Sequence, residues 1–187
     1  MKSMIKKLFF ICILTFFIND TYAKEDIMIL KLKNGDVEIE LYNDLAPNHV
    51  KRFIKLAEEK KYDGVVFHRV IEGFMAQSGD VKYGNSNSEN YNLKLAGTGG
   101  SEYPDLKAEF SNANHERGTL SMARSSDPNS ANSQFFICFN SAPHLDRQYT
   151  VFGKVINGME FVDLIKKGDG SNGEVSDPDI IISLSKK

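Results

Sequence analysis

Two alternating runs joined by Asn34 and Gly35 constrain the fold of this 187-residue chain more than any other feature. Apolar and polar side chains alternate in residues 27–32 and again in residues 37–42. A period of two is typical of strands that bury one face. Asn-Gly between such runs favours a tight turn, because both residues tolerate positive φ. The sequence therefore predicts an antiparallel hairpin close to the start of the folded part.

The period changes in residues 46–60. Val50, Phe53 and Ala57 follow the 3.6-residue period of a helix, and charged residues fill the opposite face. Pro47 suits the first turn of a helix, where its missing N–H is not needed. We therefore expect an amphipathic helix that covers part of the sheet.

The rest of the chain alternates short apolar runs with polar loops. Runs rich in β-branched and aromatic residues predict strands at residues 65–71, 135–139, 150–155 and 180–184, and residues 158–168 predict a short helix closed by Gly168. Residues 82–104 are rich in Gly, Asn and Ser and predict a long surface loop. We find no internal repeat, so we predict one domain, a β-barrel or sandwich with helical caps.

Residues 1–23 have the pattern of a secretory signal peptide. A cationic start is followed by an apolar run over residues 8–18, then by polar residues and by Ala23, after which cleavage is expected. The apolar run is too short for a membrane-spanning helix, which needs about 20 residues. We therefore expect an exported, periplasmic protein with one domain at residues 24–187. An uncleaved leader that anchors the protein in the inner membrane, or a secreted protein, is the alternative.

The charge of the mature chain excludes several classes of partner. Without residues 1–23 the chain has 20 basic and 24 acidic side chains, a formal charge of −4. This balance favours neither nucleic acid nor an anionic membrane as a partner. Cys138 is then the one remaining cysteine, and its apolar surroundings in sequence predict a buried, inert thiol.

The common catalytic patterns are missing from the sequence. None of the four histidines pairs with another or with cysteine at metal-ligand spacing, and there is no Gly-x-Ser-x-Gly motif. Residues 97–101 are rich in glycine but lack the Gly-Lys-Ser/Thr ending of a phosphate-binding loop. A flexible turn is the better interpretation of that cluster.

Three longer segments carry more information. They read FHRVIEGFMAQSGD at residues 67–80, GTLSMAR with NSQFFI at residues 118–124 and 132–137, and HLDRQYTVFGKV at residues 144–155. In order, spacing and residue type these segments resemble the signature of the cyclophilin family of peptidyl-prolyl cis–trans isomerases. The resemblance covers roughly residues 27–186, and a block of this length is far more specific than a short motif.

This resemblance implies a fold, an activity and a site. The fold is a closed eight-stranded antiparallel β-barrel capped by two α-helices, and the activity is the isomerisation of X–Pro bonds, without cofactor or metal, in unfolded or flexible polypeptides. The implied catalytic residue is Arg69. The implied substrate-binding residues are Phe74, Met75, Gln77, Ala123, Arg124, Gln134, Phe135, His144, Leu145 and Tyr149. Among these, the apolar pocket for proline is expected from Phe74, Met75, Phe135 and Leu145, and the protein is expected to act as a monomer.

The role expected of Arg69 follows from the reaction. Amide resonance makes the barrier to rotation about 18–20 kcal/mol, and the proline nitrogen recovers a lone pair when the bond is twisted. A donor directed at that nitrogen binds the twisted form better than either planar isomer, as catalysis requires. Arginine suits this role because it is always charged and offers only donors. The resemblance assigns to Gln77 the task of holding the flanking carbonyl groups.

Each of these residues also has a simpler interpretation. Arg69 alone would be a solvated surface residue, and the apolar members of the set would be ordinary core. His68 should be structural, since it faces opposite to Arg69 in an alternating strand. A binding module or holdase that uses the same groove without turnover is the alternative function, and the presence of Arg69 favours the enzyme.

The chain departs from the family pattern at three places. His144 stands where the best-known eukaryotic members carry Trp, and Tyr149 stands where they carry His. Residues 82–96 are longer than the common pattern before the glycine-rich turn. This insertion either tunes the choice of substrate or is a simple elongation of the loop, which costs little free energy.

Overall fold

A computed structural model describes residues 26–170 and 172–187, so the predicted leader at residues 1–23 lies outside the described part. The elements in chain order are β1 (Asp26–Leu32), β2 (Gly35–Leu41), α1 (Pro47–Glu58), β3 (Arg69–Ile71), β4 (Met75–Ser78), β5 (Thr119–Met122), β6 (Phe135–Cys138), the 3₁₀ turn η1 (Pro143–Leu145), β7 (Val151–Asn157), α2 (Met159–Asp163) and β8 (Ser183–Lys186). Among the described residues, no helix is long and apolar enough to cross a bilayer.

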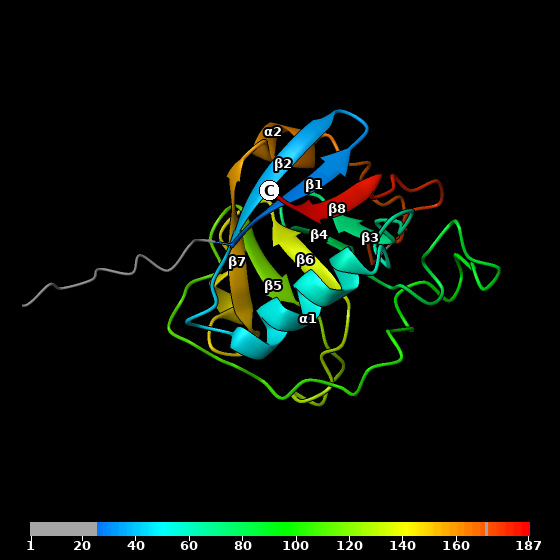
Figure 1. The fold of residues 1–187 in the computed structure, drawn as a ribbon. Coiled ribbons are helices and arrows are strands. Elements are labelled where there is room, and N and C mark those ends of the chain that lie inside the picture. Colours follow the sequence, from blue (N-terminus) through cyan, green and yellow to red (C-terminus); the bar gives the residue numbers. More distant parts are fainter. Residues whose placement is uncertain (1–25, 171) are drawn as a thin grey trace, which may run out of the picture.

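The eight strands form one antiparallel sheet in the order β3-β4-β6-β5-β7-β2-β1-β8. The sheet curls into a half-barrel, with α1 and α2 at opposite ends of it (Figure 1). The predicted hairpin is confirmed: β1 and β2 pair from Asp26 opposite Leu41 to Leu32 opposite Gly35. Gly35 is required by close packing, because a Cβ atom there would lie 2.4 Å from the ring of Phe161.

The prediction of a closed barrel is wrong. β3 and β8 are the outer strands of the sheet, and the described residues show no ladder between them. The gap is crossed by isolated antiparallel bridges, Val66 with Ile180 and Arg69 with Glu174, rather than by a continuous ladder. Pro178 lies in the returning segment and has no N–H to donate to a ladder. The barrel therefore stays open along this seam.

Three predicted elements also have boundaries that differ from the structure. Of residues 65–71, Arg69–Ile71 alone form a strand, and the last strand begins at Ser183 rather than at residue 180. The helix expected over residues 158–168 ends at Asp163, well before Gly168. Beyond its end the backbone N–H of Lys166 donates to the carboxylate of Asp179 at 2.8 Å. This tertiary bond replaces the helical one.

The sheet separates two apolar clusters. The larger cluster fills the half-barrel, where the ring of Phe53 from α1 meets the rings of Phe135 and Phe152 edge to face, each at 5.2 Å between centroids. The smaller cluster lies on the outer face of the sheet and includes Met75, Phe136, Cys138, Ala142 and Leu145. Successive residues of β6 therefore belong to different clusters, as the alternation of a strand requires.

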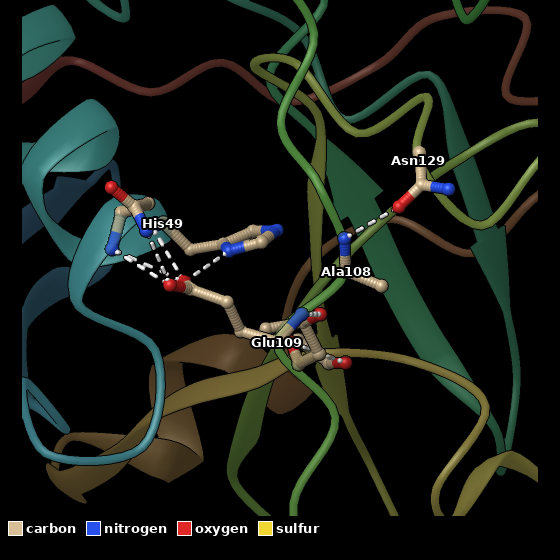
Figure 2. A network of polar contacts seen from close by, with 7 residues as sticks. His49, Ala108, Glu109 and Asn129 are labelled. Carbon is tan, nitrogen blue, oxygen red and sulfur yellow. Dashed lines mark hydrogen bonds and ion pairs between the residues drawn. The ribbon is translucent and has the colours of Figure 1, made fainter.

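A carboxylate from a distant segment caps helix α1. The helix begins at Pro47, as predicted, and Ala46 before it has no side chain that can accept a hydrogen bond. Glu109 takes this role: its carboxylate accepts from the backbone N–H groups of Asn48 and His49, at 3.1 and 3.2 Å, and from the side chains of both residues (Figure 2). An anion at a helix N-terminus also interacts favourably with the helix dipole.

We expect Glu109→Ala to lower the free energy of unfolding by about 1–2 kcal/mol, the usual effect of removing a helix N-cap. Glu109→Gln should lower it less, because the amide oxygen still accepts one backbone N–H. Urea denaturation of both variants measures the change. Glu116→Ala is the control, since its pair with Lys154 is exposed and worth little; equal losses in Glu109→Ala and Glu116→Ala would contradict a capping role.

Candidate functional site

The register of the sheet gathers the candidate residues on its outer face. Arg69 of β3 lies opposite Gln77 of β4, and Gln77 lies opposite Phe136 of β6. Two residues along β4, Met75 lies opposite Cys138. Because side chains of paired residues point to the same face of a sheet, these residues share the outer face. Residues of η1 and of the segment after β5 complete the site from the side.

These side chains line a hollow of about 330 Å³, which we call the Arg69 hollow. Its lining residues are Arg69, Phe74, Met75, Gln77, Ala123, Arg124, Phe136, His144, Leu145 and Tyr149. The structure therefore brings together all the predicted site residues except Gln134 and Phe135. The apolar walls are rigid parts of the smaller cluster: Met75 is 2% exposed and Leu145 is 8% exposed.

The assignment of Phe135 to this pocket is corrected by the structure. Phe135 is fully buried on the inner face, where its ring packs edge to face against the rings of Phe53 and Tyr62. Phe136 lines the Arg69 hollow in its place. Two adjacent residues of a strand point to opposite faces, so only one of the two phenylalanines can reach the outer face.

Gln134 lines a second hollow next to the first. This Gly97 hollow, of about 460 Å³, is lined by residues 97–101, by Asp105, Ser125, Ser130, Asn132 and Gln134, and by Gln77, Ala123 and Arg124, which it shares with the Arg69 hollow. The two hollows therefore adjoin at three shared residues.

Three hydrogen bonds hold the guanidinium group of Arg69. Its Nε donates to the backbone oxygen of Asn172 at 2.9 Å, and its Nη2 donates to Asn172 Oδ1 at 3.1 Å. Its Nη1 donates to Gln77 Oε1 at 3.3 Å. A guanidinium has five N–H groups. Among the described residues three of them find acceptors, which leaves two for a molecule bound in the hollow.

A relay of amides fixes the orientation of Gln77. Gln134 Nε2 donates to the carbonyl oxygens of Gly97 and Gly99, at 3.0 and 2.8 Å. Its Oε1 atom therefore accepts from Gln77 Nε2, at 3.0 Å, and Gln77 in turn presents its own Oε1 to Arg69. The turn at the far end is anchored by the buried carboxylate of Asp80, which accepts the N–H groups of Gly97 and Gly99, both at 2.8 Å.

Aromatic rings and a second arginine form the rim of the Arg69 hollow. The rings of Phe74 and His144 lie 5.4 Å apart, and Tyr149 meets Phe136 edge to face at 5.9 Å. The guanidinium of Arg124 lies 4.4 Å from the ring centre of Tyr149 and donates to backbone oxygens nearby. This stack keeps Arg124 at the edge of the hollow, between it and the Gly97 hollow.

A Ser-His-Asp arrangement lies beneath the hollow. His115 contacts Asp146 through Nδ1 at 3.0 Å and Ser121 through Nε2 at 2.9 Å. Ser121 is fully buried, however, so no substrate reaches its hydroxyl. The ring of His115 stacks on Phe136, with 6.1 Å between centroids. This network therefore supports a wall of the hollow and is not a nucleophilic site.

Two further titratable side chains near the site, Cys138 and His68, are uncharged at pH 7. Burial raises the pKa of the Cys138 thiol to about 12, so the predicted inert cysteine is confirmed. His68 is 6% exposed and burial, against the opposing effect of Asp80, lowers its pKa to about 4. His68 is therefore neutral at pH 7 and adds no second charge beside Arg69. Among the described residues, no cluster of three or more His, Cys, Asp or Glu could hold a metal.

Sequence reasoning missed several residues that shape the site. The strand alternation of residues 135–139 carried a signal for Phe136, since one of the two phenylalanines had to face outward. Asn172 had no such signal, because it lies about a hundred positions from Arg69 in a loop. The buried pairing of His115 with Ser121 and Asp146 was equally invisible, since these residues meet only after the sheet has formed.

Comparisons with known proteins agree with one another. The family model described as "Cyclophilin type peptidyl-prolyl cis-trans isomerase/CLD" matches residues 27–186. A probable peptidyl-prolyl cis-trans isomerase of Brucella suis is 59% identical over 162 residues, which cover 86% of this chain and 82% of the relative. A peptidyl-prolyl cis-trans isomerase of Helicobacter pylori is 40% identical over 162 residues, covering 84% of this chain and 91% of the relative.

Solved structures give the same result. A cyclophilin type peptidyl-prolyl cis-trans isomerase from Cryptosporidium parvum, crystallised in the presence of the dipeptide Ala-Pro, superposes with a TM-score of 0.72 at 30% identity. The match covers 86% of this chain and 98% of that one. The cyclophilin AquaCyp293 from Hirschia baltica superposes with a TM-score of 0.71 at 25% identity, covering 86% of this chain and 73% of that one.

The lowered pKa of His68 predicts a pH dependence of stability. Its folded value of about 4 lies below the ordinary value of 6.5, so the unfolded chain binds the proton first as the pH falls. The free energy of unfolding therefore falls as the pH drops below about 6.5. His68 alone should lower it by about 2 kcal/mol between pH 7 and pH 5. Burial lowers the pKa of His49 and of His115 as well, so both add to the loss.

The measurement is urea denaturation at pH 7 and at pH 5, for the wild type and for His68→Gln, which does not titrate. We expect the loss between the two pH values to be smaller in the variant by about 2 kcal/mol. An equal loss in both proteins would show that His68 is not responsible.

Proposed function

The chain belongs to the cyclophilin family of peptidyl-prolyl cis–trans isomerases, and from this premise we propose that Arg69 is the group that accelerates the rotation. The protein is an isomerase of X–Pro bonds. The observation that carries the proposal is the way Arg69 is held: three N–H groups are bound to the protein, and two remain beside the apolar walls of the Arg69 hollow.

The proposed mechanism needs no covalent step. Phe74, Met75, Phe136 and Leu145 receive the proline ring in a water-poor pocket. The free N–H groups of Arg69 donate to the proline nitrogen as the bond twists and its lone pair returns. The bond forms fully only in the twisted state, so it lowers the barrier rather than tightening the ground state. A preorganised donor in a poorly solvated pocket also needs little reorganisation during the reaction.

We assign supporting roles to the remaining residues of the two hollows. Gln77 Nε2 has a second N–H beyond the one it donates to Gln134, and this group holds a carbonyl of the bound chain. Ala123, Arg124, His144 and Tyr149 line the path of the residues that flank the proline. Gln134 contributes by fixing Gln77 and by lining the Gly97 hollow.

We further propose that the protein works beyond the inner membrane, as a monomer, on unfolded or flexible polypeptides that contain proline. The leader at residues 1–23 supports export, with an uncleaved anchor as the alternative. Slow X–Pro isomerisation limits the folding of many chains, so an isomerase there assists folding. The Ala-Pro dipeptide used with the Cryptosporidium relative supports proline-containing ligands.

Arg69→Ala tests the mechanism. The variant loses a charge-assisted hydrogen bond worth about 1.5–3 kcal/mol, so we expect kcat/KM to fall about ten- to a hundredfold. Arg69→Lys should recover only part of the loss, because an ammonium lacks the planar fork that Asn172 and Gln77 hold. The measurement is a coupled isomerisation assay with a short proline peptide, beside peptide binding by titration.

Arg117→Ala is the control for the loss of an arginine, since Arg117 pairs with Asp163 outside both hollows. Unchanged turnover in Arg69→Ala would refute the role of Arg69. Peptide binding without measurable turnover in the wild type would support the alternative, a holdase that uses the same groove.

Asn172→Ala tests the support of Arg69. The variant keeps the backbone acceptor and loses Oδ1, so Arg69 should sample orientations away from the hollow. We expect kcat to fall about three- to tenfold, the effect of one ordinary hydrogen bond, while KM changes little. The unfolding midpoint should stay within error, because Asn172 is exposed. A change in KM alone would mean that Asn172 contacts substrate instead.

A further inference from the structure

A third hollow lies behind the long loop of residues 82–96. This Tyr103 hollow has a volume of about 660 Å³, and its lining residues are Leu56, Glu59, Lys61, Val81, Lys82, Ser88, Asn90, Gly100, Ser101, Glu102 and Tyr103. Its floor comes from α1 and from Tyr103, and its outer wall comes from the loop that is longer than the family pattern. The insertion therefore creates a concave surface that a shorter loop would not form.

The outer wall of this hollow is tied to the turn that follows α1. Asn85 Nδ2 donates to the backbone oxygen of Lys61 at 3.3 Å, and Ser86 donates to the backbone oxygen of Gly64 through its N–H at 2.9 Å and its hydroxyl at 2.7 Å. Gly64 has a φ of +84°, and a Cβ atom there would lie 2.2 Å from Asn87 Nδ2. The loop is thus packed against the body of the protein at a defined place.

The ring of Tyr103, at the floor of the Tyr103 hollow, is also fixed by contacts with its neighbours. The hydroxyl of Tyr103 donates to Glu59 Oε1 at 2.6 Å, and the ammonium of Lys55 lies 4.0 Å from the centre of its ring. The guanidinium of Arg52 is 5.1 Å from the same centre. These contacts immobilise a large amphipathic ring, so any side chain that packs against its uncovered part does so with little loss of conformational entropy in the ring.

The three hollows form a series with shared walls. Gly100 and Ser101 line both the Tyr103 hollow and the Gly97 hollow. Gln77, Ala123 and Arg124 line both the Gly97 hollow and the Arg69 hollow. The Gly97 hollow therefore lies between the other two, and an extended polypeptide with its proline beside Arg69 would reach the Tyr103 hollow by way of Gly100 and Ser101.

We propose that the Tyr103 hollow is a distal subsite for the polypeptide whose proline occupies the Arg69 hollow. This proposal rests on the proposed function of the Arg69 hollow. The subsite takes an apolar side chain of the flanking segment, since the half-buried side chains of Val81 and Tyr103 give its lining an accessible apolar part. The rim carries two lysines, Lys61 and Lys82, and two glutamates, Glu59 and Glu102, so it favours neither sign of charge. The protein thus selects long, apolar clients over short peptides.

The proposal predicts that turnover depends on substrate length. The probes are a tetrapeptide, Ala-Ala-Pro-Phe, and the same four residues extended by Ser-Leu-Ser-Leu-Ser on the N-terminal side, on the C-terminal side, or on both. We expect kcat/KM to rise about tenfold on adding the extension that reaches the subsite, the effect of partly burying one leucine. A matched extension of serine alone should give a much smaller gain.

Asn90→Trp fills the hollow and is the decisive variant. Asn90 is exposed and lines the hollow, whereas the adjacent Glu89 is exposed and does not line it. Asn90→Trp should abolish the gain from the extension and leave the tetrapeptide unchanged, whereas Glu89→Trp should retain both activities. Circular dichroism confirms that both variants fold.

The outcomes separate this proposal from the one on which it rests. Equal kcat/KM for the tetrapeptide and all extended peptides, or equal effects of both Trp variants, would overturn the distal subsite while leaving the role of Arg69 intact. Tetrapeptide turnover that is insensitive to Arg69→Ala would refute the mechanism instead. Saturation of the Tyr103 hollow by an added apolar peptide without proline, with no effect on isomerisation, would show an occupant other than the client chain and would also overturn the proposal.

Discussion

The alternation of side chains along the paired strands β4 and β6 underlies both the core and the candidate site of this protein. On β6, Phe135 closes the core inside the half-barrel and Phe136 forms a wall of the Arg69 hollow on the other side. On the neighbouring strand β4, Ala76 faces inward and Gln77 faces outward. A shift of register by one residue would exchange these faces. The core and the hollow are therefore specified by the same pairing.

The polar part of the site depends on a chain of hydrogen bonds with a single consistent direction. Asp80 can only accept, so it fixes the N–H groups of the turn at Gly97 and Gly99 and leaves their carbonyls for Gln134. The side-chain oxygen of Gln134 then accepts from Gln77 Nε2. This bond fixes the orientation of the Gln77 amide, whose oxygen accepts from Arg69. A buried carboxylate at one end thus determines the position of a guanidinium at the other, and both amides are oriented without ambiguity.

Features that depend on local pattern were predictable, and features that depend on long-range contacts were not. The hairpin and the helix that starts at Pro47 follow from periodicity, and the structure confirms both. The expected turn chemistry is wrong in detail, because the turn lies at Lys33 and Asn34, Gly35 already pairs with Leu32, and Asn34 has no positive φ. The closed barrel failed because the segment beyond Gly173 meets Val66 and Arg69 only in isolated bridges, which no local pattern in the sequence could show. The resemblance named segments that meet in the Arg69 hollow, yet it chose Phe135 over Phe136. Only pairing with β4 and packing against Phe53 decide which ring faces outward.

The groups that accept hydrogen bonds from Arg69 suit the role that we propose for its positive charge. All three are neutral: two oxygens of Asn172 and one of Gln77. A carboxylate in either place would hold the guanidinium as firmly but would neutralise much of its field, and the attraction for a lone pair would fall accordingly. Asp80 is kept apart by its four backbone N–H donors, and His68 is neutral. Every hydrogen bond that orients Arg69 thus goes to a neutral group, although backbone hydrogen bonds and, to a smaller extent, the nearby charge of Arg69 lower the pKa of Glu174. Among the described residues no carboxylate forms an ion pair with Arg69, so the positive charge that we propose acts on the twisting bond is held mainly by dipoles.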